Sequence, residues 1–227
     1  FVVLDTVSGT DYLYEWEAAG TSQIVVATSS LGDVTVDRST TTERTFFADA
    51  ASTSVLTVTT GSQLDFLAGA STTDFVIASG ATTTFAANQT FDMAGVLNNS
   101  GTFTIPETSY FNLAGSGVSQ NVTTPWPDNV YVTGDHTITA GNTFNNLVTN
   151  SGGALTIDTV ATTTDLTVNT GSTFTIDSGD TFNLGSIFDV DGTFTNDGTL
   201  TFTAEAGDAT LTSDASATGD SDTLQTT

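Results

Sequence analysis

Paired aspartates are the side chains of this 227-residue chain whose types could carry out hydrolysis. A glycosidase needs two carboxyl groups, and Asp189 with Asp191, or Asp177 with Asp180, supply such pairs by type. Aspartates at turns normally cap and solvate those turns, however. The sequence therefore predicts that these side chains are structural and that the chain is not an enzyme.

The single histidine, His136, is the other candidate for acid–base chemistry. Asp135 precedes it, but no serine or cysteine motif accompanies the two residues. We therefore expect a loop histidine without a catalytic role. In the same stretch Trp126 lies between two prolines, where its ring could stack on a sugar. The alternative is a loop that folds onto the protein surface.

Three aspartates that recur after equivalent apolar segments form a weak candidate metal site. They are Asp158, Asp177 and Asp197. If the segments stack, carboxylates about 5 Å apart repel by about 1 kcal/mol or more near a surface, and a calcium ion would relieve that repulsion. The Gly-Gly calcium-binding nonapeptide is absent. We expect no cofactor and simple solvation of these aspartates, with bound calcium as the alternative.

The charge balance excludes whole classes of partner. Asp and Glu number 26 against 2 Lys plus Arg, which gives a net charge of −24. Because phosphate binding relies on clustered basic side chains, we expect no nucleic-acid partner and no attraction to an anionic membrane. No apolar run approaches the roughly 18 residues that span a bilayer, so we also expect no membrane insertion.

The composition favours an all-β protein outside the cell. The chain has 50 Thr, 21 Ser and 15 Phe, and only 3 Pro. Thr, Val, Ile and Phe suit a pleated, half-buried surface, while Gly and Asn suit the turns between strands. Three sequons, at Asn88, Asn98 and Asn121, could accept glycans. The lack of cysteine leaves the redox compartment unassigned.

The chain contains an internal duplication at an offset of 91 residues. Residues 56–116 match residues 147–207 at 18 of 61 positions without a gap. Thr72-Thr73-Asp74 falls on Thr163-Thr164-Asp165, and the glycines and apolar residues stay in register. Chance matches between threonine-rich segments would not preserve that register. We infer a true structural repeat.

A shorter period of 19 to 20 residues runs inside the second copy. Segments that begin with an apolar residue and a threonine and end with aspartate recur at Leu155, Phe174 and Phe194, and each follows a glycine. Short apolar–polar–apolar triplets, such as Leu166-Thr167-Val168, lie between them. Such triplets are typical of strands with one face turned inward. A parallel β-helix satisfies both periods, with about eight coils over residues 51–207, apolar ladders inside and threonine ladders outside. The alternative is a pair of tandem β-sandwich domains.

The periods divide the chain into three parts. The first 50 residues hold both arginines and read as an N-terminal β segment or cap, although 32–37 already resemble a coil. The middle part is the duplicated solenoid, and the last part is an acidic Ser/Thr-rich tail or linker. The ranges are 1–50, 51–207 with copies at about 51–116 and 142–207 joined by a loop at 117–141, and 208–227.

Two stretches, 165–176 and 191–202, resemble the repeats of secreted microbial surface and fibre proteins of the parallel β-helix type. These include adhesins similar to filamentous haemagglutinin and autotransporter passengers. The resemblance covers roughly residues 51–207 and lies in the style of the repeats. It implies a secreted structural or adhesive role and transfers no site residues.

These observations predict a structural subunit of an extracellular filament or cell-surface fibre. Its partner would be a second copy of the chain, joined head to tail through the apolar terminal strand Phe1-Val2-Val3-Leu4, unless that strand caps its own first coil. One alternative function is a carbohydrate-binding adhesin or tail-fibre module that contacts surface glycans. A second is a polysaccharide-degrading β-helix enzyme.

Overall fold

The computed structural model describes residues 3–5, 12–18, 21–27, 29–30, 32–37, 44–47, 51–121, 126–203, 210–213 and 224–226. Within these residues the chain forms strands and turns and no helix. Parallel strands stack as a β-solenoid of about eight turns. The prediction of an all-β parallel β-helix is confirmed, and the tandem sandwich, whose strands would pair antiparallel, is excluded.

The chain divides into two compact units, residues 1–111 and 112–227, and each is described by itself. The division falls within strand β14 (Tyr110–Leu113). Most of the first sequence copy lies in unit 1, and the second copy lies in unit 2. Each unit therefore contains one solenoid copy of the 91-residue repeat.

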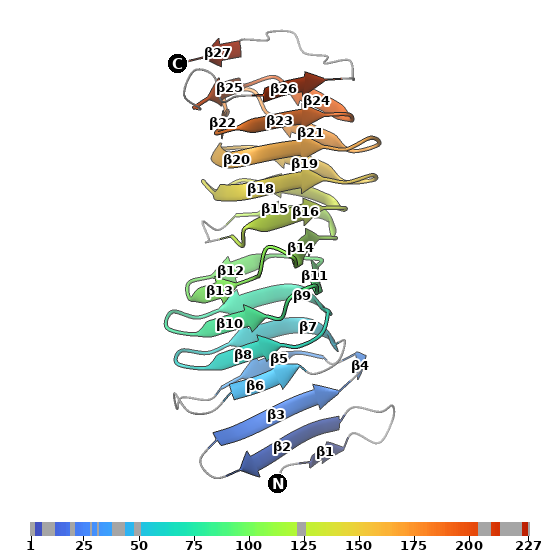
Figure 1. Ribbon diagram of the computed structural model, residues 1–227, viewed down its shortest axis with the longest axis vertical. Coiled ribbons are helices and arrows are strands. Elements are labelled where there is room, and N and C mark those ends of the chain that lie inside the picture. The colour runs from blue at the N-terminus through green and yellow to red at the C-terminus, as the bar shows by residue number, and fades with distance from the viewer. Residues whose placement is uncertain are drawn as a thin grey trace. The chain divides into compact units, whose positions relative to one another are not determined.

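From β3 onward, unit 1 consists of parallel stacks of short strands (Figure 1). Its strands are β1 (Val3–Asp5), β2 (Tyr12–Ala18), β3 (Thr21–Ala27), β4 (Ser29–Ser30), β5 (Val34–Val36), β6 (Arg44–Phe47), β7 (Ala51–Val58), β8 (Gln63–Phe66), β9 (Ala70–Ile77), β10 (Thr82–Phe85), β11 (Thr90–Met93), β12 (Leu97–Asn99) and β13 (Thr102–Thr104). One stack has the order β3-β6-β8-β10-β13. In another, β7 pairs with β9, and β9 pairs with both β11 and β12.

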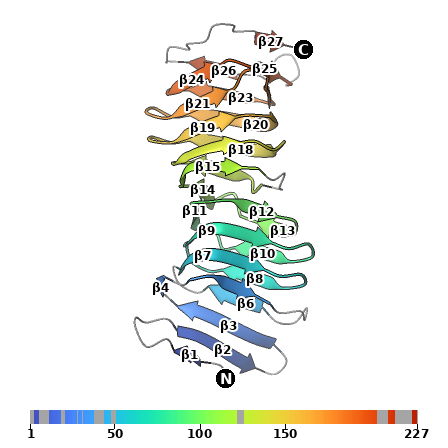
Figure 2. The same ribbon diagram turned by 180° about the vertical axis from the view of Figure 1, so that it is seen from behind.

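The N-terminal segment of unit 1 differs because its first strands pair antiparallel. β1 pairs with β2, and β2 pairs with β3. β3 then pairs in parallel with β6, which begins the solenoid pattern (Figure 2). β5 also pairs in parallel with β7, with Val34 opposite Leu56 and Val36 opposite Val58. The expectation that residues 32–37 resemble a coil is confirmed.

Unit 2 repeats the plan of unit 1. Its strands are β15 (Ser116–Gln120), β16 (Asn129–Val132), β17 (Asp135–Ile138), β18 (Thr143–Thr149), β19 (Ala154–Ile157), β20 (Val160–Val168), β21 (Thr173–Ile176), β22 (Thr181–Leu184), β23 (Ile187–Val190), β24 (Thr193–Asn196), β25 (Thr199–Phe202), β26 (Thr210–Ser213) and β27 (Leu224–Thr226). One stack has the order β15-β17-β19-β21-β24. In the other, β16 pairs with β18, β18 with β20, and β20 with both β22 and β23.

The C-terminal tail contributes two further strands to unit 2. β26 pairs in parallel with β23, and β27 pairs in parallel with β25. The tail at 208–227 therefore includes strands that pair with their own chain. Its residues outside β26 and β27 lie outside the described part of the chain.

The interval 117–141 is solenoid, although the sequence assigns it to a connecting loop. It contains most of β15 and all of β16 and β17, and the last two pair in parallel with β18 and β19. Inward-facing residues alternate regularly again at Val130, Val132, His136 and Ile138, all of which are buried. Parallel pairing therefore begins again at β16, two residues after Pro127. Residues 122–125 lie outside the described part of the chain.

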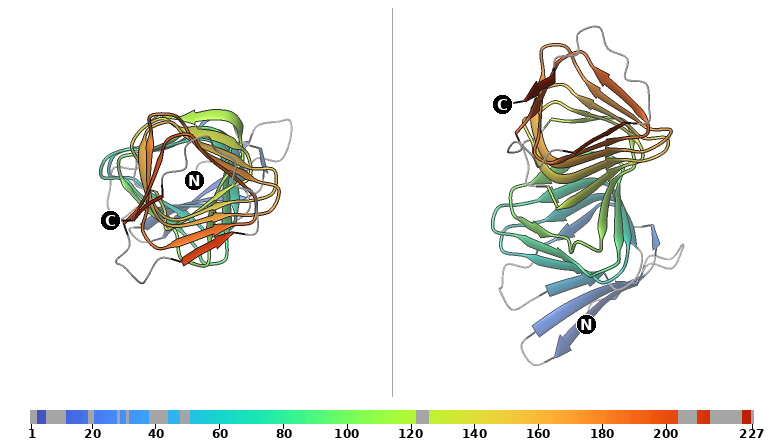
Figure 3. Two further views of the ribbon diagram at one scale, coloured as in Figure 1. Left: turned by 90° about the horizontal axis from the view of Figure 1, so that it is seen from above. Right: turned by 45° about the horizontal axis from the view of Figure 1, so that its top comes forward.

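The coils enclose an interior (Figure 3). The buried side chains that form the core of each unit are mainly apolar. Leu155 lies opposite Phe174, and Phe174 opposite Phe194, as predicted. The rings of Phe174 and Phe194 stack with centroids 6.0 Å apart and planes 15° apart. Each side chain of this size contributes about 1.5–3 kcal/mol when it is fully buried. The interior ladder is thus the main stabilising element of the fold.

A corner in unit 1 depends on Asp74. The first half of β9 pairs with β11 and the second half with β12, so the next coil turns between them. At this turn the Val96 N–H donates to Asp74 Oδ1 (2.8 Å), and the Thr72 hydroxyl donates to the Asp74 carbonyl oxygen (2.9 Å). These bonds satisfy polar groups that the corner would otherwise leave unpaired.

The second copy builds the same corner in unit 2. The Ile187 N–H donates to Asp165 Oδ1 (3.1 Å), and the Thr163 hydroxyl donates to the Asp165 carbonyl oxygen (2.9 Å). β20 likewise pairs with β22 along its first half and with β23 along its second half. The Thr-Thr-Asp triplet common to both copies is therefore a corner motif, which is why the duplication retains it.

Backbone conformation also matches between the copies at a turn where the residue types differ. Asn88 has φ 61°, in the left-handed region, and the equivalent Gly179 has φ 93°. Asn is among the few residue types other than Gly that enter this region readily. The turn geometry is therefore the same in both copies despite the substitution.

Gly101 lies where the backbone of the preceding coil leaves no room for a side chain. A Cβ atom there would lie 2.6 Å from the carbonyl oxygens of both Ala78 and Ala81. The equivalent Gly192 is equally crowded, with two carbonyl oxygens at 2.5 and 2.7 Å from a Cβ. A Cβ atom on Gly32 would meet no other part of the chain within 4 Å, so Gly32 serves as a control.

We predict that Gly101→Ala and Gly192→Ala each lower the free energy of unfolding by about 1–3 kcal/mol, because a coil must shift to admit the methyl group. Gly32→Ala should change it by less than about 0.5 kcal/mol. Urea denaturation followed by circular dichroism measures the three values. Equal effects of all three substitutions would contradict the close stacking of the coils.

Candidate functional site

The three candidate metal ligands follow stacked strands of unit 2. Asp158, Asp177 and Asp197 come directly after β19, β21 and β24. The N–H of each donates to a carbonyl oxygen of the preceding coil at 2.9 Å, those of Ile138, Ile157 and Ile176 in turn. The backbones of these aspartates are therefore in register, as predicted. Asp158 and Asp197 are exposed, and Asp177 is half-buried.

Asp180 joins this acidic ladder electrostatically. Its pKa is raised, first because partial burial penalises the carboxylate and then because Asp158 and Asp177 repel its charge. In the described part of the chain, no three His, Cys, Asp or Glu side chains gather closely enough to hold a metal ion. Asp158 and Asp177 therefore repel the charge of Asp180. Simple solvation of the ladder stays the prediction, with bound calcium as the alternative.

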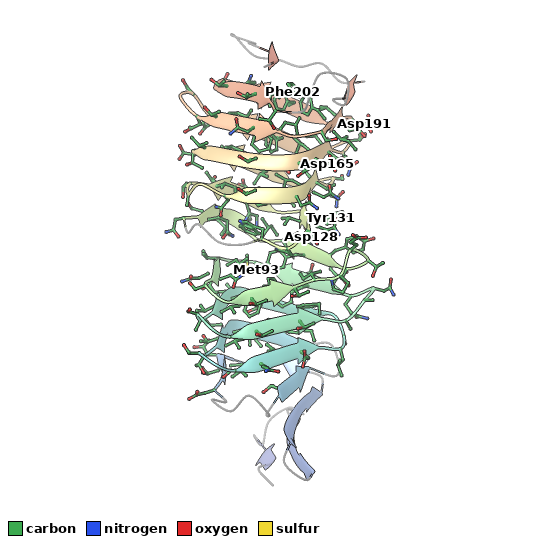
Figure 4. All side chains as sticks on the ribbon, turned by 60° about the vertical axis from the view of Figure 1, so that its left-hand side comes forward. Met93, Asp128, Tyr131, Asp165, Asp191 and Phe202 are labelled. Carbon is green, nitrogen blue, oxygen red and sulfur yellow. The ribbon has the colours of Figure 1, made fainter. Side chains whose placement is uncertain are left out.

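The second candidate carboxylate pair lies at the end of β23. Asp189 points outward between the buried Phe188 and Val190, and Asp191 is exposed in the following turn. Figure 4 shows Asp191 and Asp165 on the outer side of the unit 2 coils. The Asp165 carboxylate accepts the hydrogen bond of the corner from the Ile187 N–H, whereas Asp189 and Asp191 extend from the surface of the coil. The expectation that these carboxylates are structural stays a prediction.

His136 is not a loop residue, in contrast to the sequence-based expectation. It lies in β17, its side chain is 0 % exposed, and it is level with Leu155 of the next coil. The pKa of His136 is lowered to about 4, mainly because burial disfavours the imidazolium ion, while Asp135 partly opposes this shift. A catalytic role would require access to substrate, which this position does not offer.

A sequence signal could have placed His136 inside the coil. It precedes Leu155 by 19 residues, the same step that separates Leu155 from Phe174. His136-Thr137-Ile138 therefore occupies the place of an apolar–polar–apolar triplet. Because histidine is polar, the search for apolar residues at 19-residue steps does not find position 136.

Trp126 lies against the coil rather than extending from it. Its ring centroid is 5.1 Å from that of the buried Phe144, with the planes tilted by 39°. Trp126 is half-buried and the following Pro127 is buried. One face of the indole is therefore already occupied, which favours a segment folded onto the protein surface over an open sugar-stacking platform.

The outer face of the sheet β15-β17-β19-β21-β24 carries a ladder of hydroxyl groups, as the sequence predicts. Thr137, Thr156, Thr175 and Thr195 lie opposite one another in successive strands, and all four are half-buried. Branched side chains in this position protect the strands and stabilise their pairing. Asp135 of β17 is the one acidic residue within these five strands, and the acidic ladder follows the face along its edge.

Both copies repeat part of this hydroxyl face. In unit 1, Thr82 lies opposite Thr102 and Thr84 opposite Thr104. In unit 2, the equivalent pairs are Thr173 with Thr193 and Thr175 with Thr195. The duplication therefore preserves an outward threonine pattern as well as the interior, in agreement with the predicted threonine ladders.

The candidate glycosylation residues are accessible. Asn88, Asn98 and Asn121 are all exposed. Asn88 lies in the turn between β10 and β11, and Asn98 points outward from β12. Accessibility is required for glycan transfer, and modification of these residues stays a prediction.

The candidate assembly strand is partly used within its own chain. Val3 pairs with Tyr14 and Leu4 with Leu13, in the antiparallel pair β1–β2. Phe1 and Val2 lie outside the described residues. Within the described residues no strand pairs with the other edge of β1, which ends its sheet.

Comparison of this chain with known protein families, curated proteins and solved structures finds no match in any of the three. Across the described ranges, no helix has the length and apolar character needed to cross a membrane. The function must therefore be inferred from the residues and geometry of the chain itself.

We predict that Asp180→Asn raises the melting temperature at pH 7 and low salt, whereas Asp180→Glu, which keeps the charge, does not. A carboxyl group whose pKa is raised by folding binds its proton more tightly in the folded state. Its charged form therefore destabilises the fold above that pKa, and the penalty disappears as the pH falls through it. High salt should shrink the gain. Thermal melts of the three proteins measure this.

Equal melting temperatures for the Asn and Glu variants would contradict the repulsion among these carboxylates. The same melts test the metal alternative. Simple solvation predicts that calcium and a chelator leave the wild-type melting temperature unchanged. An increase with calcium that a chelator reverses, and that Asp158→Asn abolishes, would instead establish the ladder as a cation site.

Proposed function

We propose that this chain is a structural subunit of an extracellular filament or cell-surface fibre that assembles through its terminal strands. The observation that carries the proposal is what the duplication retains. Both copies keep the interior ladder, the Asp74 and Asp165 corners and the crowded Gly101 and Gly192 positions. These are features that a stack of coils needs for its own integrity.

The outer surface supports the same proposal. It combines neutral threonine ladders with exposed carboxylates, in a chain whose net charge is −24. Neutral hydroxyl faces and a strong negative charge keep a β-rich surface hydrated and oppose lateral aggregation. Contacts between subunits are then left to the ends of the strand stacks.

The ends of the chain supply edges suitable for such contacts. In the described part of the chain, β1 is the last strand at one end of its sheet, and β27 is the last strand at one end of the sheet that contains β25. An unpaired strand edge templates further pairing. Pairing of a terminal strand of one subunit with a terminal strand of the next is a heterologous contact, and repetition of that contact gives an open filament.

The resemblance of residues 165–176 and 191–202 to secreted β-helical surface proteins agrees with this role. In that setting the filament would lie outside the cell or on its surface, and Asn88, Asn98 and Asn121 would be accessible to glycosylation there. Adhesion to glycans is a role that a fibre of this kind would add through other segments, since the Trp126 ring is already packed on Phe144.

Electron microscopy and sedimentation of the full chain at high concentration test the proposal. We predict filaments from the wild type and their loss on deletion of residues 1–4, with circular dichroism unchanged. Leu67→Thr is the control for loss of an exposed apolar side chain away from the terminal strand, because Leu67 is 49 % exposed and lies in the turn after β8. It should assemble as the wild type does. A wild-type chain that stays monomeric would refute the filament.

A further inference from the structure

His136 occupies an inward position that every adjacent coil fills with an apolar residue. In register, Val118 of β15 lies on one side of it and Leu155 of β19 on the other. The imidazole is 0 % exposed, and neither ring nitrogen has a hydrogen-bond partner among the described residues. A neutral imidazole in this state already forfeits a donor bond and an acceptor bond.

Among the described strands around β17, no charged side chain faces the imidazole. β15 and β19, the two strands that pair with β17, contain no titratable residue. The inward residues of β16 are Val130 and Val132, both 0 % exposed. On β17 itself the charged residue is Asp135, which is exposed and adjacent in sequence, so its side chain points to the opposite face of the strand.

We propose that His136 makes the coil formed by β16 and β17 an acid-sensitive element, which opens when protonation of the imidazole becomes favourable. The protonated ring carries two N–H donors, and neither ring nitrogen has an acceptor within hydrogen-bond distance among the described residues. The charge can be solvated only if β17 separates from β15 or β19 and admits water. This device is independent of the proposed filament role.

The direction of the pH dependence follows from the pKa of His136. That pKa is about 4 in the folded chain, below the ordinary value of 6.5. The open form therefore binds a proton more readily than the closed form. The stabilisation of the closed coil is complete above about pH 6.5 and is lost as the pH falls towards 4, with up to about a tenfold rise in the opening equilibrium constant per pH unit.

The effect should be local. In a solenoid each coil contacts only its neighbours, so a charge placed in one coil acts mainly on that coil. The segment with Trp126 lies immediately before β16 in the chain, and its ring packs on Phe144 of β18. Opening of β16 and β17 would therefore change the surroundings of Trp126 as well.

Nuclear magnetic resonance of the full chain tests the protonation step directly, because the chain has one histidine. With histidine labelled by nitrogen-15, we expect ring signals of the neutral form that stay unchanged from pH 7 to about 5. Below that pH a second set of signals, from the protonated open form, should appear. A ring that titrates near pH 6.5 while the protein stays folded would overturn the proposal.

A stability comparison tests the consequence. His136→Leu places in β17 the residue that β19 has at the same level, and Thr137→Val changes the outward neighbour as a matched control. Because all three proteins share the carboxylates, their differences isolate the imidazole. The advantage of the leucine variant over the wild type should grow by up to about tenfold in the unfolding equilibrium constant per pH unit between 6.5 and 4. The valine control should show a constant difference.

An advantage of the leucine variant that does not depend on pH would refute the proposal. If His136→Leu fails to fold, the histidine titration decides alone. Hydrogen exchange, corrected for the intrinsic effect of pH, tests the locality. Acidification should increase exchange in residues 129–138 before it does so in β21 and β24. A simultaneous increase throughout the unit would overturn the local opening.

Discussion

The stacking of inward side chains at equal levels is the constraint on which the rest of this structure depends. Parallel pairing in register brings each interior residue to about 4.8 Å from the residues one coil before and after it. Phe174 and Phe194 meet in this way, and so do Phe66 and Phe85, whose centroids are 4.2 Å apart. A side chain at an interior position must therefore pack against the side chains of the coils before and after it. The recurring apolar triplets reflect this requirement.

This constraint leaves the corners and the outside to other chemistry. At the corners, the carboxylates of Asp74 and Asp165 accept hydrogen bonds from backbone N–H groups that lie between two strands of the next coil. On the outside, threonines form ladders and aspartates follow them at the turns, where repulsion among Asp158, Asp177 and Asp180 is tolerated because water is close. The outward residues therefore determine the chemistry of the surface without disturbing the packing of the interior.

Sequence reasoning predicted the fold well where periodicity is strong. The 91-residue offset and the 19-residue step indicated parallel coils. The stacking of Leu155, Phe174 and Phe194 in successive coils followed from these periods. It failed at 117–141, where two prolines and a histidine suggested a loop. Pairing in a solenoid resumes immediately after a local interruption, and burial inside a coil can outweigh the polarity of one imidazole.

The candidate site was predictable only in part. Alternation within β19, β21 and β24 placed the three aspartates after stacked strands, but the proximity of Asp180 depends on the path of a turn and carries no periodic signal. The packing of Trp126 on Phe144 brings together residues from different segments and was likewise not readable from spacing. Interior positions recur at a fixed period in the sequence, whereas turns and surface segments each have their own local geometry.

A double-mutant cycle between Phe174 and Phe194 tests the stacking of levels most directly. Leucine is the suitable replacement at both positions, because Leu155 occupies the same ladder. The free energies of unfolding of the wild type, both single variants and the double variant give the coupling between the two rings. In-register stacking predicts a favourable coupling of about 0.5–1.5 kcal/mol. A coupling of zero would show that the two rings do not meet and would contradict the ladder.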